Sequence, residues 1–138
     1  PVDRGVADAA ILLAQGHVEE AVSVLDRLIR TADLGSAEGS ALAINACWLK
    51  LELGRNDGVD SLIAHIDDFC DDYAPAAVVR ARFMQQLGLN DEAHAELQRV
   101  LVRWPQSPLR IVHDLLRGDD SPAARARRLG LLTWALGP

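Results

Sequence analysis

The amino-acid sequence predicts an all-α fold in which antiparallel helical hairpins stack on one another. The first observation is a repeated phrase: a glycine ends one helix, acidic residues soon follow, and apolar residues then recur at helical spacing. Its three copies begin at Gly16, Gly54 and Gly88, which are 38 and 34 residues apart. Periods of this size are typical of helical-repeat solenoids.

Composition and length support the same class. Of the 138 residues 49% are apolar, yet the chain contains only three Trp, two Phe and one Tyr. Cores of small aliphatic residues suit close-packed helices better than sheets, and a chain of this length can fold without a metal or a disulfide. We therefore expect a single domain over residues 1–138, with repeats at about 2–33, 40–72 and 75–105 and closing helices at 108–136.

The first hairpin begins with a helix of small apolar residues at 6–14, which Gly16 ends. The second helix begins at Glu19 and Glu20 and ends near Arg30, so its charges complement the helix dipole. Apolar residues at helical spacing predict one buried face on this helix: Ala21, Val24, Leu25, Leu28 and Ile29.

The second hairpin contains the most apolar helix of the chain, at residues 41–53. Because this helix is apolar almost all round, we expect it to be buried on every side. The following helix ends in an acidic cluster, which we call the Asp67–Asp72 edge. Its aspartates repel one another, and their negative charge at the C-terminal end is unfavourable for the helix dipole. We interpret this edge as a solvated acidic surface. Docking of a basic partner is the alternative, whereas a cation loop would need a glycine that the edge lacks.

The third hairpin begins with Pro75, which suits the first position of a helix. After Gly88, its second helix places Ala93 where the two helices cross, and only a small side chain fits a close crossing. Ser121 and Pro122 then predict the start of the last helix. That helix is apolar over much of its circumference around Trp134, so we expect self-association or a domain contact there.

The phrase from Gly88 to Pro105 resembles the second half of a tetratricopeptide repeat. That family has a turn glycine, a small residue, three apolar positions and a final proline, and this chain has Gly88, Ala93, Leu97, Val100, Leu101 and Pro105 at the matching places. The copy at Gly16 lacks the proline and the copy at Gly54 is poorer. The first halves match less well, and Lys50 occupies a position that is normally apolar. The resemblance covers roughly residues 2–105.

The resemblance implies a right-handed solenoid that binds protein or peptide partners and catalyses nothing. In such arrays the first helix of each hairpin lines a concave groove, which here gives a partner-binding set: Ile44, Trp48, Glu52, Val78, Arg82, Gln85 and Gln86. We expect an apolar anchor near Trp48 and an acidic or carbonyl group near Arg82 and Gln85. The alternative for Trp48 is a plain core residue. The family's carboxylate-clamping subset is not expected, because only Asn45 matches its motif.

Residues that would carry chemistry are scattered. The four histidines stand singly, Cys47 and Cys70 lack a CxxC spacing, and no phosphate-binding glycine loop or GxSxG turn occurs. We therefore predict no enzyme, no metal and no cofactor. A net charge of −6 argues against nucleic acid and anionic membranes, so Arg125, Arg127 and Arg128 are interpreted as a charged helix face.

These observations predict a non-catalytic binding scaffold in a reducing cytoplasm. Lys50 is the single lysine among 14 basic residues, a bias that suggests a GC-rich bacterium. The alternative is a sensor or regulatory segment of a larger bacterial transcriptional or signalling regulator. An effector domain in the same open reading frame would favour that alternative.

Overall fold

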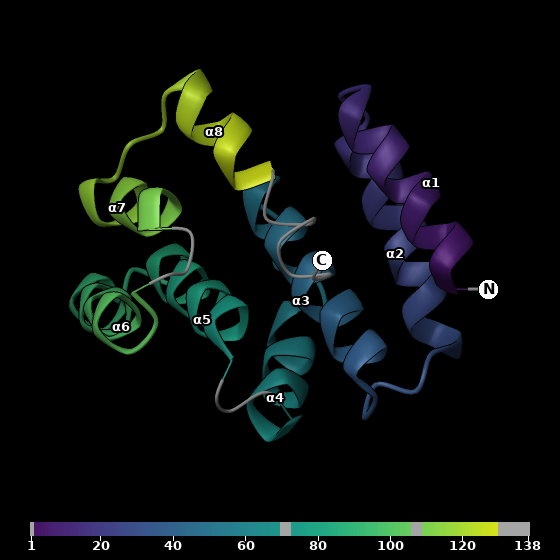
Figure 1. Cartoon of the computed structure of the whole chain (residues 1–138), viewed down its shortest axis with the longest axis horizontal. Coiled ribbons are helices and arrows are strands. Elements are labelled where there is room, and N and C mark those ends of the chain that lie inside the picture. The colour runs from purple at the N-terminus through teal and green to yellow at the C-terminus, as the bar shows by residue number, and fades with distance from the viewer. Residues whose placement is uncertain (1, 70–72, 106–108, 130–138) are drawn as a thin grey trace.

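The computed structural model describes residues 2–69, 73–105 and 109–129, and within these ranges the chain forms eight α-helices and no strand (Figure 1). The all-α class predicted from the repeats is therefore confirmed. The helices are α1 (Val2–Ala14), α2 (Val18–Thr31), α3 (Ala37–Glu52), α4 (Val59–Phe69), α5 (Ala74–Gln86), α6 (Asn90–Arg103), α7 (Leu109–Arg117) and α8 (Pro122–Leu129).

Consecutive helices pair into hairpins, and the hairpins pack side by side. Helix α1 packs on α2, α3 on α4, and α5 on α6. Helix α3 lies at the centre, with α1 and α2 on one side and α5 and α6 on the other (Figure 1). It contacts α2, α4 and α5, so the core is organised around it.

The central helix is buried as its sequence predicts. Every residue from Leu42 to Leu51 is buried. Its start differs from the expected residue 41, because Ser36 caps the helix by accepting a hydrogen bond from the Gly39 amide at 3.0 Å. Ala93, in the helix that packs on α5, is fully buried as predicted.

Lys50 is buried in α3 at a position where an apolar residue was expected. Its side chain is 6% exposed, and Nζ lies 3.3 Å from the Asp26 carboxylate of α2. The same ammonium donates a hydrogen bond to the backbone carbonyl of Asp57 at 3.1 Å. A charge withdrawn from water needs such partners, and these tie α3 to α2 and to the α3–α4 turn.

Four helix ends share one turn geometry, which explains the glycine period. Gly16, Gly54, Gly88 and Gly118 have φ between 66° and 83°, a region that other residues rarely adopt. After Gly88, the amide of Leu89 donates to the Met84 carbonyl at 2.9 Å, as in a Schellman turn. No atom lies within 4 Å of a Cβ added at these four glycines, so backbone conformation alone requires them.

The C-terminal pair turns back toward the centre of the stack. Helix α7 packs on α6, and α8 packs on α7 and extends toward α3 (Figure 1). The closing pair predicted at 108–136 is thus present as far as residue 129. Trp134, proposed above as a contact residue, lies outside the described residues.

Candidate functional site

Three of the residues predicted to line a groove are apolar, and all three lie in the core. Ile44, Trp48 and Val78 are at most 1% exposed. The indole Nε1 of Trp48 also donates a hydrogen bond to the backbone carbonyl of Arg128 in α8. Trp48 is therefore a core residue in this structure, which was the alternative interpretation of the sequence, and its ring is not accessible to a partner.

The four polar members of the predicted set lie together. Glu52 ends α3, while Arg82, Gln85 and Gln86 stand in the last turns of α5. They line a pocket of about 340 Å³ with Asp120, Arg125, Leu51 and Gly54, which we call the α3–α5 pocket. A neighbouring pocket of about 250 Å³ shares Arg82 and Gln85 and is otherwise lined by α7, α8 and the turn between them.

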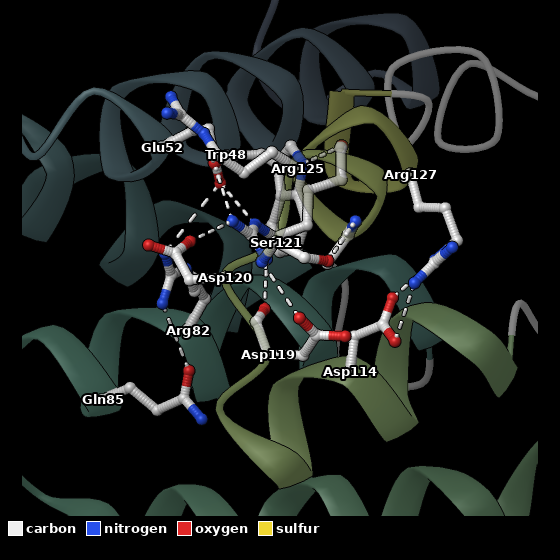
Figure 2. Close-up of polar contacts among 12 residues, drawn as sticks. Trp48, Glu52, Arg82, Gln85, Asp114, Asp119, Asp120, Ser121, Arg125 and Arg127 are labelled. Carbon is white, nitrogen blue, oxygen red and sulfur yellow. Dashed lines mark hydrogen bonds and ion pairs between the residues drawn. The ribbon is translucent and has the colours of Figure 1, made fainter.

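A buried ion pair joins the end of α3 to α8 beside this pocket (Figure 2). Arg128 donates from Nε and Nη2 to the two carboxylate oxygens of Glu52, at 2.7 and 3.0 Å. The two side chains are only 2% and 4% exposed. Arg125 donates to the same carboxylate at 3.2 Å. A guanidinium fork on a carboxylate is a directional contact, which the sequence does not reveal because 76 residues separate the partners.

Every guanidinium nitrogen of Arg128 has an acceptor. Besides Glu52, it donates to the Asp119 carbonyl at 3.0 Å and to the Asp120 carboxylate at 2.6 Å. The hydrogen bond to Glu52 raises the pKa of Arg128 above its ordinary value, although burial acts in the opposite direction. Buried charges are tolerated when they are paired in this way.

Arg82 lies across the same carboxylate but is poorly supplied (Figure 2). Its Nη2 is 3.9 Å from Glu52, which is an ion-pair distance but too long for a hydrogen bond. Nη1 donates to the Gln85 side-chain oxygen at 3.4 Å, and the buried Nε has no hydrogen-bond partner among the described residues. Burial lowers the pKa of Arg82, while attraction to Glu52 opposes this shift. Arg82 therefore presents unused donor capacity at the pocket.

The two glutamines connect the pocket to its surroundings. Gln85 donates to the Leu115 carbonyl of α7 at 3.1 Å. Gln86 donates to the Asn56 side-chain oxygen in the α3–α4 turn at 2.6 Å. Both amides therefore fix the relative positions of the elements that surround the pocket.

A second ionic cluster lies within the C-terminal pair. Asp114 of α7 is completely buried and accepts two hydrogen bonds from Arg127 of α8, at 2.6 and 3.1 Å. Arg117 donates to it at 2.9 Å. The hydrogen bond from Arg127 lowers the pKa of Asp114, against the effect of burial. Sequence reasoning missed this cluster, because Asp114 lies within α7 and its partner Arg127 lies 13 residues away in the next helix.

Other candidate residues are structural in the part of the chain that the structure describes. No group of three or more His, Cys, Asp or Glu side chains in those ranges is placed to hold a metal ion. Burial raises the pKa of the Cys47 thiol to about 12, which disfavours the reactive thiolate. Of the Asp67–Asp72 edge, the Asp67 side chain pairs with Arg80 at 2.8 Å, and Asp71 and Asp72 lie outside the described residues. Over the described residues, no helix has both the length and the apolar character needed to cross a membrane.

No protein-family model, curated protein or solved structure matches this chain. The tetratricopeptide resemblance therefore stays a prediction. The site is interpreted below from its own geometry.

Proposed function

We propose that this chain is a non-catalytic scaffold module that binds a protein or peptide partner at the α3–α5 pocket. The observation that carries the proposal is Arg82, a partly exposed guanidinium beside an open polar pocket, whose Nη2 lies 3.9 Å from Glu52 and makes no hydrogen bond to the described residues. Arginines in such positions often dominate the binding energy of an interface. A carboxylate or carbonyl of the partner would supply the acceptor that Arg82 lacks.

The proposal includes a tetratricopeptide-like right-handed solenoid. It is supported by the repeated glycine turns and by the packing of each hairpin on the next. In this arrangement α1, α3 and α5 line the concave face, and the pocket lies at the C-terminal ends of α3 and α5.

We propose binding instead of catalysis because of what lines the pocket. Its two carboxylates, Glu52 and Asp120, already accept hydrogen bonds from Arg128. The described lining residues include no histidine, cysteine or serine that would act as a base or a nucleophile. The remaining polar groups are donors and acceptors suited to a peptide.

Affinity capture with the full chain tests the proposal. A captured partner should bind the Arg82→Ala/Gln85→Ala variant about 30-fold more weakly, a loss of about 2 kcal/mol, while circular dichroism shows that the variant keeps its helical fold. Arg99→Ala removes an equal charge from the exposed face of α6 and is the control. Binding that survives the double variant but is lost when the Asp67–Asp72 edge is neutralised would place the site on that edge instead.

A further inference from the structure

Helix α8 is attached to the rest of the chain by charge more than by apolar packing. Its only buried residues in the described range are Ala124 and Arg128. Arg128 is also among the largest fully buried side chains of the described residues, and it makes four hydrogen bonds. Arg128 makes two of the three side-chain hydrogen bonds between α8 and Glu52 at the end of α3, and Arg125 makes the third.

Arg128 contacts two residues that were predicted to bind a partner, Glu52 and Trp48. Its side chain takes the Glu52 carboxylate, and its own backbone carbonyl accepts the indole N–H of Trp48. The turn before α8 places Asp120 at the wall of the α3–α5 pocket, where its charge acts on Arg82. The C-terminal pair thus supplies a cation to Glu52 and an anion near Arg82, as an external ligand would.

We propose that α8 is an internal pseudo-ligand, and that the partner of this face is a peptide segment presenting an arginine, which displaces Arg128 from Glu52. This inference rests on the proposed function and names the chemistry of its partner. Displacement is feasible because an ion pair can be exchanged for an equivalent one, whereas an apolar helix would have to expose its core.

The geometry selects arginine over the other charged side chains. The two oxygens of Glu52 receive two parallel N–H donors at 2.7 and 3.0 Å, which suits a planar guanidinium. A lysine ammonium offers a point charge without this fork. An acidic side chain next to Glu52, which is only 4% exposed, would meet a like charge, so the acceptor that this segment offers to Arg82 is a backbone carbonyl.

Trp48 adds a second requirement. The Trp48 Nε1 donates to the backbone carbonyl of Arg128, and the Arg128 side chain pairs with Glu52. The site therefore contacts both the side chain and the backbone of a single residue. The displacing arginine must therefore have an accessible carbonyl, as at the end of a helix or in an extended segment.

The test uses the full chain and a fluorescent synthetic peptide of residues 121–129, with anisotropy as the readout. The Arg128→Ala chain should bind this peptide about tenfold more tightly than the wild type, whose own arginine competes at high effective concentration. Arg99→Ala is the matched control, because it removes an arginine of α6 that pairs with Glu96 and touches neither Glu52 nor α8. This control should leave peptide affinity at the wild-type value.

Two further arms establish the chemistry. A peptide with Arg128→Lys or Arg128→Gln should bind the Arg128→Ala chain about tenfold more weakly, since it lacks the fork. Adding Glu52→Gln to the Arg128→Ala chain should weaken binding of the original peptide by a similar factor. Equal binding of the Arg and Gln peptides, retention of binding without Glu52, or binding of an acidic peptide at the same site would each overturn the proposal.

Hydrogen exchange in the wild-type chain provides a measurement that needs no variant. Excess peptide should accelerate exchange of the α8 amides while α3 and α5 stay protected. Unchanged α8 exchange at saturating peptide, or formation of a dimer that exchanges α8 between copies, would also overturn the inference. Binding of a captured partner can depend on Arg82 and Gln85 even if the peptide experiments give the contrary results. In that case the proposed function stands and the pseudo-ligand proposal is rejected.

Discussion

Helices α3 and α8 meet at the Glu52 carboxylate and at the Trp48 indole, but they are held in the molecule in different ways. Helix α3 is surrounded by α2, α4 and α5, and its residues from Leu42 to Leu51 are all buried. Helix α8 buries one alanine and one arginine. Apolar packing is the main contact of α3, with Lys50 as its polar exception, whereas α8 depends on hydrogen-bond geometry and on charges that salt and acid weaken. We expect α3 to unfold only with the whole domain and α8 to detach locally.

The largest effect should follow from emptying the core at α3. Leu49→Ala removes a fully buried side chain and should lower the free energy of unfolding by about 2–5 kcal/mol, as cavities in packed cores do. Urea denaturation followed by circular dichroism measures this loss. Val102→Ala, at a side chain 82% exposed, is the control and should change stability by less than about 0.5 kcal/mol. A loss of similar size at both positions would contradict the apolar account of α3.

Overfilling the core should cost less. Ala93→Leu adds three carbons at a fully buried position in α6 and should destabilise the domain by about 1–3 kcal/mol. We expect the melting temperature to fall. Hydrogen-exchange protection of the α8 amides should fall no more than the stability of the rest of the chain. Selective loss of protection in α8 would show that the two regions are coupled more tightly than their contacts indicate.

The same chemical change at the two helix starts compares the regions directly. Ser36 caps α3 and Ser121 caps α8, each accepting a backbone hydrogen bond through its hydroxyl, at 3.0 and 3.2 Å. Replacing either with Ala should cost about 1 kcal/mol. For Ser36→Ala the cost should lower the global denaturation midpoint. For Ser121→Ala it should increase hydrogen exchange within α8 and leave the midpoint nearly unchanged.

Acid should affect the C-terminal pair with a defined sign. Because the hydrogen bond from Arg127 lowers the pKa of Asp114 below its ordinary value of 3.8, ionised Asp114 stabilises the folded state. This contribution is complete above the ordinary value and is lost as pH falls through the lower, folded-state pKa. The protection factors of the α8 amides, corrected for the intrinsic pH dependence of amide exchange, should therefore fall on acidification below about pH 4.

Asp114→Asn should reduce this acid dependence. Asp57 offers a comparison outside the C-terminal pair, since the hydrogen bond from Arg55 lowers its pKa to about 2. Asp57→Asn should leave the acid response of α8 as it is in the wild type. An α8 response that persists in Asp114→Asn would assign the effect to other carboxylates.

The hairpins were predictable because their signals are local. A glycine with positive φ ends each of four helices, and the apolar circumference of α3 predicted its burial. The same property hid the distinction between groove and core at Trp48, because a helix that is apolar on all sides gives no face to choose. Local propensity also failed at Lys50, whose burial depends on Asp26 from another helix.

The return of α8 onto α3 was not predictable from the sequence. Its main contact joins Glu52 and Arg128, and ion pairs leave no periodic pattern that would connect residues 76 positions apart. The polar members of the predicted site could be placed close together from the sequence, because the repeat register puts them on α3 and α5. Their connection to Arg125, Arg128 and Asp120 required the tertiary structure.

The Glu52–Arg128 contact also sets how many hairpins this architecture can hold. The turns at Gly54 and Gly88 have nearly the same backbone conformation, so an extra 34-residue unit between them would fit both of its neighbours locally. Such a unit would move α8 one layer further along the stack, about 10 Å from its present place. An arginine side chain cannot cover that additional distance. The closing pair can therefore form the Glu52–Arg128 contact only when a single hairpin separates it from α3, the helix that carries Glu52.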